Sequence, residues 1–174
     1  MSTTVVMVLL RIAHIVAGMF WVGSALFVTF FLMPTMRALG PGGRPVMGHL
    51  TQQLRLPTWI MWTAVLTILS GIGLYWRLSG GFASAWIHSG AGRVFGLGGA
   101  LAIVSFVMGL VVNKPTAARM GALAAAMERA GGPPAPEQAA ELARLQRRLY
   151  LASIESAILL TLATAAMACA RYVG

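Results

Sequence analysis

Four long apolar stretches follow one another along the chain, each bounded by proline, aromatic or charged residues. At about 1.5 Å per residue, roughly 20 apolar residues cross the hydrocarbon core of a bilayer. The pattern therefore predicts four transmembrane helices, at about residues 4–33, 57–76, 93–113 and 150–172. A second domain has no room, so we expect residues 1–174 to form a single all-α, integral membrane four-helix bundle.

Prolines stand at three of the predicted helix boundaries. The first helix is expected to stop at Pro34 and the third at Pro115, because proline lacks the backbone donor that continues a helix. Pro57 opens the second helix, where the missing donor costs nothing. The first stretch is longer than a bilayer core requires, so it is expected to tilt or to protrude.

A polar insert separates the third and fourth apolar stretches. Residues 116–130 and 136–148 are rich in the helix formers Ala, Glu, Leu and Arg. The sequence Gly131-Gly132-Pro133-Pro134 interrupts them. The pattern predicts a helical hairpin that extends the third and fourth helices into the cytoplasm.

Composition and charge agree with a membrane protein. Hydrophobic residues make up 58% of the 174 positions and charged residues 10%, and the mean hydropathy is +0.79, which leaves too little polar surface for a soluble domain. The net charge of +9 comes from basic residues beside the apolar stretches. Such residues contact anionic lipid headgroups, so the expected partner is the lipid bilayer and not nucleic acid.

The basic residues divide unevenly between the two sides of the predicted bundle. Nine lie on one side and three on the other: Arg37, Arg44, Arg55, Lys114, Arg119, Arg129, Arg144, Arg147 and Arg148 against Arg77, Arg93 and Arg171. Cytoplasmic loops carry the excess of Lys and Arg in membrane proteins. We therefore expect a multi-pass protein of the inner (cytoplasmic) membrane with both termini outside.

Ionisable residues inside the predicted spans are the first candidates for chemistry, because they are costly in lipid. Arg11, His14 and Gly18 share one face of the first helix, since they lie three or four residues apart. Glu155 enters the fourth span from the basic side, and a cation such as Lys114 is expected to hold its carboxylate. A proton-relay role for Glu155 is the alternative.

Glycines gather in the half of the predicted bundle that contains the termini. They are Gly18, Gly71, Gly73, Gly92, Gly96, Gly98 and Gly99. Close helix packing is one explanation. The other is a flat haem, which needs an imidazole ligand, small residues along its faces and cations for its propionates. His14 and these glycines, with Arg11, Arg77 or Arg93, meet those needs.

The remaining histidines differ in their expected position. His88, in Trp86-Ile87-His88 before the third helix, is either a second haem ligand at the outer edge or a surface residue. His49 lies on the opposite, basic side and is not expected to meet His14. The 11 methionines raise copper as an alternative, but they do not cluster at ligand spacing.

The segment RIAHIVAGMFWVGSALF, with His14 followed by Trp21-Val22-Gly23, resembles the first helix of the HemJ-type protoporphyrinogen oxidases and of the copper-resistance protein D family. The resemblance continues through Leu56-Pro57, the stretch from Thr67 to Ile72, and Trp86-Ile87-His88.

The resemblance to the HemJ family implies a four-helix membrane protein that binds haem b through the histidine of the first helix, here His14. That family has a functional lysine two positions after its Trp-x-His motif, where this sequence has Gly90. The resemblance therefore implies a haem site without extending to protoporphyrinogen oxidation, and it leaves membrane oxidoreductase activity open.

The leading expectation is a membrane haem-b redox or electron-transfer protein with the haem in the outer half of the bundle. His14 and His88 are its candidate iron ligands, and Arg11, Gly18, Arg93, Gly96 and Gly99 are candidates for contact with the cofactor. Two alternatives stay open. One is an accessory membrane subunit without catalysis that packs beside other subunits or a second copy, and the other is a copper-handling membrane protein.

Overall fold

The computed structural model describes residues 3–133 and 135–173, and every regular element in these ranges is helical. In chain order the elements are α1 (Thr3–Phe27), η1 (Val28–Leu32), α2 (Met33–Leu39), η2 (Gly40–Gly43), α3 (Arg44–Gly48), η3 (His49–Gln53), α4 (Leu56–Leu78), α5 (Ser84–Ile87), α6 (Gly90–Met108), η4 (Gly109–Asn113), α7 (Lys114–Ala130), α8 (Pro136–Cys169) and η5 (Ala170–Tyr172). Pro134, which belongs to the predicted break in the hairpin, lies outside the described residues. Met1, Ser2 and Gly174, at the ends of the predicted domain, also lie outside them.

Four helical runs within the described residues are long and apolar enough to cross a membrane: Thr3–Leu39, Leu56–Leu78, Gly90–Ala130 and Pro136–Tyr172. Short elements join end to end into the longer runs, so that α1, η1 and α2 form one helix of 37 residues. By length and composition the chain is a multi-pass helical membrane protein.

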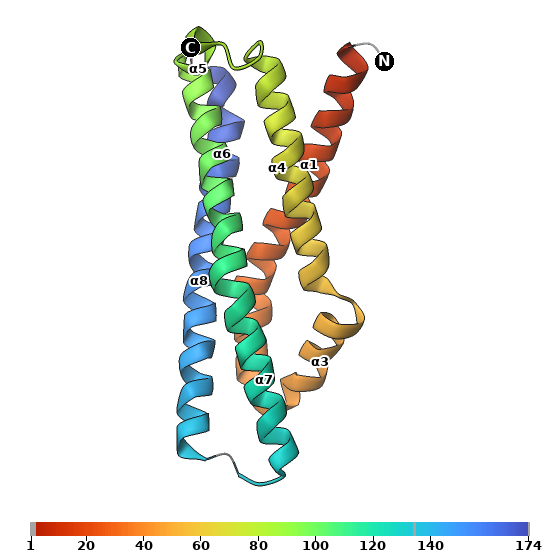
Figure 1. Ribbon diagram of the computed structural model, residues 1–174, viewed down its shortest axis with the longest axis vertical. Helices are drawn as coiled ribbons and strands as arrows, with labels where there is room; N and C mark the ends of the chain where they lie inside the picture. Colours follow the sequence, from red (N-terminus) through yellow and green to blue (C-terminus); the bar gives the residue numbers. More distant parts are fainter. Residues whose placement is uncertain (1–2, 134, 174) are drawn as a thin grey trace.

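The helices are arranged as two pairs (Figure 1). α1 packs chiefly against α4, and α6 packs chiefly against α8, while lesser contacts between α4 and α6 and between α1 and α8 join the pairs. Both ends of the described chain lie at the same end of the bundle, and the C-terminal end is beside α5. The hairpin of α7 and α8 forms the other end.

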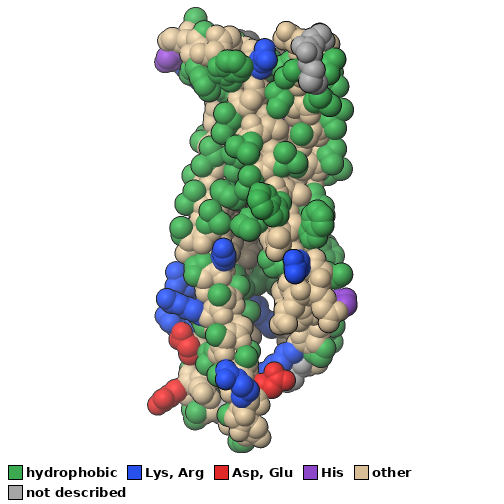
Figure 2. Space-filling model, turned by 45° about the vertical axis from the view of Figure 1, so that its right-hand side comes forward, with side chains coloured by type: hydrophobic (Ala, Val, Ile, Leu, Met, Phe, Trp, Pro, Cys, Tyr) green, Lys and Arg blue, Asp and Glu red, His purple; other side chains and the backbone are tan. Residues whose placement is uncertain are grey.

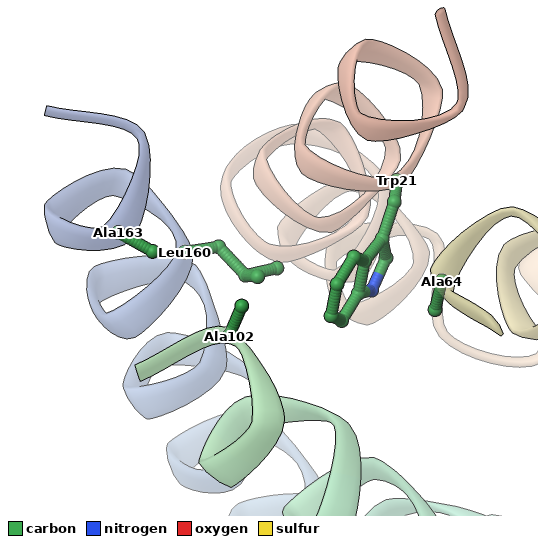
Figure 3. Close-up of a cluster of buried hydrophobic side chains, with 5 residues drawn as sticks. All are labelled: Trp21, Ala64, Ala102, Leu160 and Ala163. Carbon is green, nitrogen blue, oxygen red and sulfur yellow. The ribbon is translucent and has the colours of Figure 1, made fainter. Parts of the chain in front are cut away.

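Trp21 of α1 connects the two pairs at the centre of the bundle (Figure 3). Its side chain is 5% exposed and packs in one cluster with Ala64 of α4, Ala102 of α6, and Leu160 and Ala163 of α8. The Phe106 ring lies edge-on to the indole, with the ring centroids 6.4 Å apart. Because its neighbours are mostly alanines, one large side chain fills the space between four helices.

The helices expected to stop at Pro34 and Pro115 continue past both prolines, to Leu39 and Ala130 respectively. A π-helical turn precedes each proline: η1 ends at Leu32 and η4 at Asn113. In η1 the Met33 amide donates to the Val28 carbonyl, five residues back. In η4 the Lys114 amide donates to the Gly109 carbonyl in the same way. The wider turn moves away the carbonyl group with which the proline ring would collide, so the helix continues through the proline.

The hairpin has the break that its composition predicts. α7 ends at Ala130, and Gly131 caps it with a φ of +68°, a left-handed conformation that glycine adopts at low cost. Met127 of α7 and Leu145 of α8 are buried where the two helices pack together. Figure 2 shows that the charged side chains on this face gather toward the hairpin end, below a mostly hydrophobic region.

Candidate functional site

His14 lies in the contact between α1 and α4, about three turns from the start of α1. Its Nδ1 is 2.8 Å from the backbone carbonyl oxygen of Thr67, in the middle of α4. A carbonyl oxygen only accepts hydrogen bonds, so Nδ1 carries the proton and is the donor. In the neutral ring Nε2 then holds a lone pair, and this atom has no hydrogen-bond partner among the described residues.

Gly71 provides the space for the His14 ring. A Cβ atom built on Gly71 would lie 2.9 Å from Cε1 and 3.1 Å from Nδ1 of His14, but 3.9 Å from Nε2. The edge of the ring that contains Nδ1 therefore sits against α4, and Nε2 lies on the farther side. His14 is only partly buried, so its ring is not enclosed within the protein.

An imidazole held in this way is suited to bind a metal. A hydrogen bond from one ring nitrogen to a carbonyl fixes the tautomer and the ring orientation, and it raises the basicity of the other nitrogen. The same bond also links two helices, which is a structural role that needs no ligand. The geometry therefore supplies one oriented nitrogen ligand and an interhelical contact together.

Arg11 is the nearest cation along α1, one turn from His14 toward the end of the bundle that contains the termini. It is exposed, has no ion-pair or hydrogen-bond partner among the described residues, and lines a shallow depression with Thr3, Thr4, Met7 and Val8. Arg93, at the start of α6, is also exposed. Both guanidinium groups are available to an anionic group.

Most of the predicted glycines lie where other residues come close to the backbone. A Cβ on Gly18 would meet the Thr67 side chain at 3.4 Å, and one on Gly98 would meet Met167 at 3.0 Å. Gly96 faces the Tyr75 hydroxyl at 3.4 Å, whereas Gly99 has open space around it. Of the glycines proposed to contact a cofactor, Gly18 thus lies in the same contact as His14, and Gly96 and Gly99 lie on α6.

His88 follows α5 at the end of the bundle and is exposed. Its Nδ1 is 2.7 Å from the Ser84 carbonyl, so its Nε2 is likewise the free nitrogen. The hydrogen-bond partner of His88 lies four residues earlier in the chain, whereas the partner of His14 lies in the middle of another helix, α4. The structure places the two histidines on separate elements with no contact between them.

Glu155 is exposed on α8 and forms no ion pair with Lys114. The ion pair found in residues 3–133 and 135–173 joins Arg144 to Glu141 at 2.7 Å. Glu155 instead lines an open groove with Val112 and three arginines of α8. The expected ion pair between Glu155 and a cation such as Lys114 is thus not present in the described residues.

Two features of the site were not identified as functional from the sequence. The partner of His14 is a backbone carbonyl, which no pattern of side chains reveals, although Thr67 belongs to the stripe of small residues on the second predicted helix. Trp21 continues the face of Arg11, His14 and Gly18 at helical spacing, so its inward direction could be predicted, and its side chain is buried. Its alanine neighbours could not be predicted, because they come from three other helices.

Within the described parts of the chain, no three His, Cys, Asp or Glu side chains lie close enough together to hold a metal ion. Comparison with protein-family models, with curated proteins and with solved structures gives no match to this chain. The family resemblance of the motifs therefore stays a hypothesis.

Proposed function

We propose that this chain is a membrane haem-b protein that serves in redox or electron transfer, with Nε2 of His14 as an axial ligand to the iron. The observation that carries the proposal is the hydrogen bond from His14 Nδ1 to the Thr67 carbonyl, with the ring seated against Gly71. This arrangement orients Nε2, which has no hydrogen-bond partner among the described residues, away from α4.

The residues around His14 fit the chemistry of a haem in three respects. A half-buried imidazole is the common axial ligand of haem iron. Arg11, one turn away and without an acidic partner, suits a propionate. The apolar surface of α1 beside His14, including the exposed Ile15, suits a porphyrin face. When bound, the haem would supply a one-electron iron couple, whose potential the ligand and its hydrogen bond would tune.

The test compares haem content in histidine variants of the full chain, purified in detergent after expression with added haem precursor. We expect His14→Ala to abolish or strongly reduce the Soret absorbance, because it removes the ligand. His49→Ala is the matched control, since it removes an exposed histidine at the other end of the bundle, and it should retain the haem. Equal haem content in both variants would overturn the proposal.

Loss of the interhelical hydrogen bond is a second consequence of removing His14, and it must be separated from ligand loss. Such bonds contribute roughly 0.6 kcal/mol in membrane proteins, so the variant should stay folded. Added imidazole should restore a Soret band to His14→Gly, because it replaces the ligand without restoring the bond between helices. Failure of imidazole to restore the band in a folded variant would assign His14 a structural role.

His88→Ala addresses the second axial position. A change from a low-spin to a high-spin spectrum would identify His88 as the second ligand, whereas an unchanged spectrum would exclude it.

A further inference from the structure

An open groove of about 370 Å³ lies between α8 and the end of η4. It is lined by Val112, Arg144, Arg147, Arg148, Leu151, Ala152 and Glu155. The residues from α8 recur at steps of three or four, so they form one face of that helix. Over this face the helix changes from basic to apolar, because Leu151 and Ala152 lie one turn beyond Arg147 and Arg148.

The charges in the groove are mostly positive and unpaired. Arg144 is bound to Glu141 through both carboxylate oxygens, at 2.7 and 2.8 Å. Neither Arg147 nor Arg148 has an ion-pair or hydrogen-bond partner in the described part of the chain, and both are exposed. The one acid lining the groove, Glu155, lies seven residues beyond Arg148, roughly 10 Å farther along the helix.

Apolar and cationic lining therefore meet in one groove. The two arginines offer planar, multiply donating groups that match a phosphate. Leu151 and Val112, on α8 and η4, offer apolar surface directly beside them. Free phosphate would use only the first of these, whereas a phospholipid at the edge of an apolar span would use both.

We propose that this groove is a binding site for an anionic phospholipid, with the headgroup phosphate on Arg147 and Arg148 and the start of an acyl chain against Leu151 and Val112. The carboxylate of Glu155 repels the anion and limits the affinity of the groove.

Native mass spectrometry of the full chain in detergent, titrated with phosphatidylglycerol, tests the site. The variant Arg147→Gln/Arg148→Gln should bind this lipid roughly thirtyfold more weakly, the loss expected for two cationic contacts at about 1 kcal/mol each. The matched control is Arg119→Gln/Arg129→Gln, which removes the same charge from α7 outside the groove. An equal loss in both variants would mean a diffuse surface effect and would overturn the proposal.

A gain of binding cannot arise from misfolding, so Glu155→Gln supplies the second arm. It should bind phosphatidylglycerol severalfold more tightly than the parent, because a like charge has been removed. Unchanged or weaker binding would contradict the proposed place of the headgroup.

Two competitors identify the source of the anion. Phosphatidylcholine should not displace phosphatidylglycerol, and neither should inorganic phosphate in large excess over the lipid. Displacement by phosphatidylcholine would show that charge does not select the ligand, and displacement by phosphate would show a free-anion site. Either result would overturn the lipid assignment.

Discussion

At the scale of single residues, the contact between α1 and α4 depends on glycines, whose lack of a side chain leaves space for residues of the facing helix. Gly18, Gly71 and Gly73 of these two helices receive Thr67, His14 and Leu10 respectively at 2.9 to 3.4 Å from the position of a Cβ atom. Small residues let membrane helices approach closely, and here the approach also brings His14 within hydrogen-bond distance of a backbone carbonyl.

Gly71→Ala tests this contact directly. The added methyl group would collide with the His14 ring at 2.9 Å, so the ring must move and its bond to the Thr67 carbonyl must weaken. We expect a loss of about 1–3 kcal/mol, the usual range for overpacking, measured as a lower unfolding temperature in detergent. Gly99→Ala is the control, because nothing lies within 4 Å of its Cβ position. Equal stability of the two variants would contradict the close approach.

The sequence singles out His14 as a candidate, but it does not describe the environment of this residue. The costs of an ionisable group in a span and the shared face with Arg11 and Gly18 follow from helical spacing alone. Which helix lies opposite that face depends on packing between segments about 50 residues apart, as for His14 and Thr67. The expected pair of Glu155 and Lys114 failed for the same reason, because the two residues belong to α8 and α7 and their distance depends on how those helices pack.

At the scale of elements, the ends of the helices were predicted less well than their existence. Length and hydropathy identify the four apolar runs, and Gly131 marks the hairpin, because these signals are local. The predicted helix ends at Pro34 and Pro115 are wrong, because the helical runs continue to Leu39 and Ala130. A proline ends a regular α-helix, but a π-helical turn just before it removes the clash, and the sequence carries no simple mark of such a turn.

Leu145→Ala tests the packing between α7 and α8. Leu145 is 3% exposed, and truncation of a buried leucine costs about 2–5 kcal/mol. Because the loss falls on the hairpin, limited proteolysis near Gly132 should become faster while the apolar spans stay protected. Gln146→Ala, at the neighbouring exposed position, should cleave at the parental rate. Parental cleavage of Leu145→Ala would show that the hairpin does not depend on this side chain.

At the scale of the whole molecule, the bundle is asymmetric from end to end. One end holds both ends of the described chain and the short helix α5, and the other holds the hairpin and most of the charged side chains (Figures 1 and 2). This asymmetry predicts an orientation in the bilayer, because loops rich in Lys and Arg tend to stay in the cytoplasm. In the predicted orientation the proposed histidine site would lie in the outer half and the proposed lipid groove at the inner surface.

Reporter fusions measure this orientation. A phosphatase, which is active only outside the cytoplasm, should be inactive when inserted at Gly132 and active when fused after Gly174. A fluorescent protein that folds only in the cytoplasm is the complementary control and should give the reverse pattern. Phosphatase activity at Gly132 would contradict the orientation inferred from charge.

The proposal that the protein carries haem is tested most directly by the absorption spectrum of the parent protein, purified in detergent from cells supplied with haem. We predict a Soret band in the oxidised protein and sharpened α and β bands after reduction with dithionite. A colourless parent would contradict the claim. Bound copper without a Soret band would favour copper handling, and a protein with neither chromophore nor metal would favour an accessory membrane subunit.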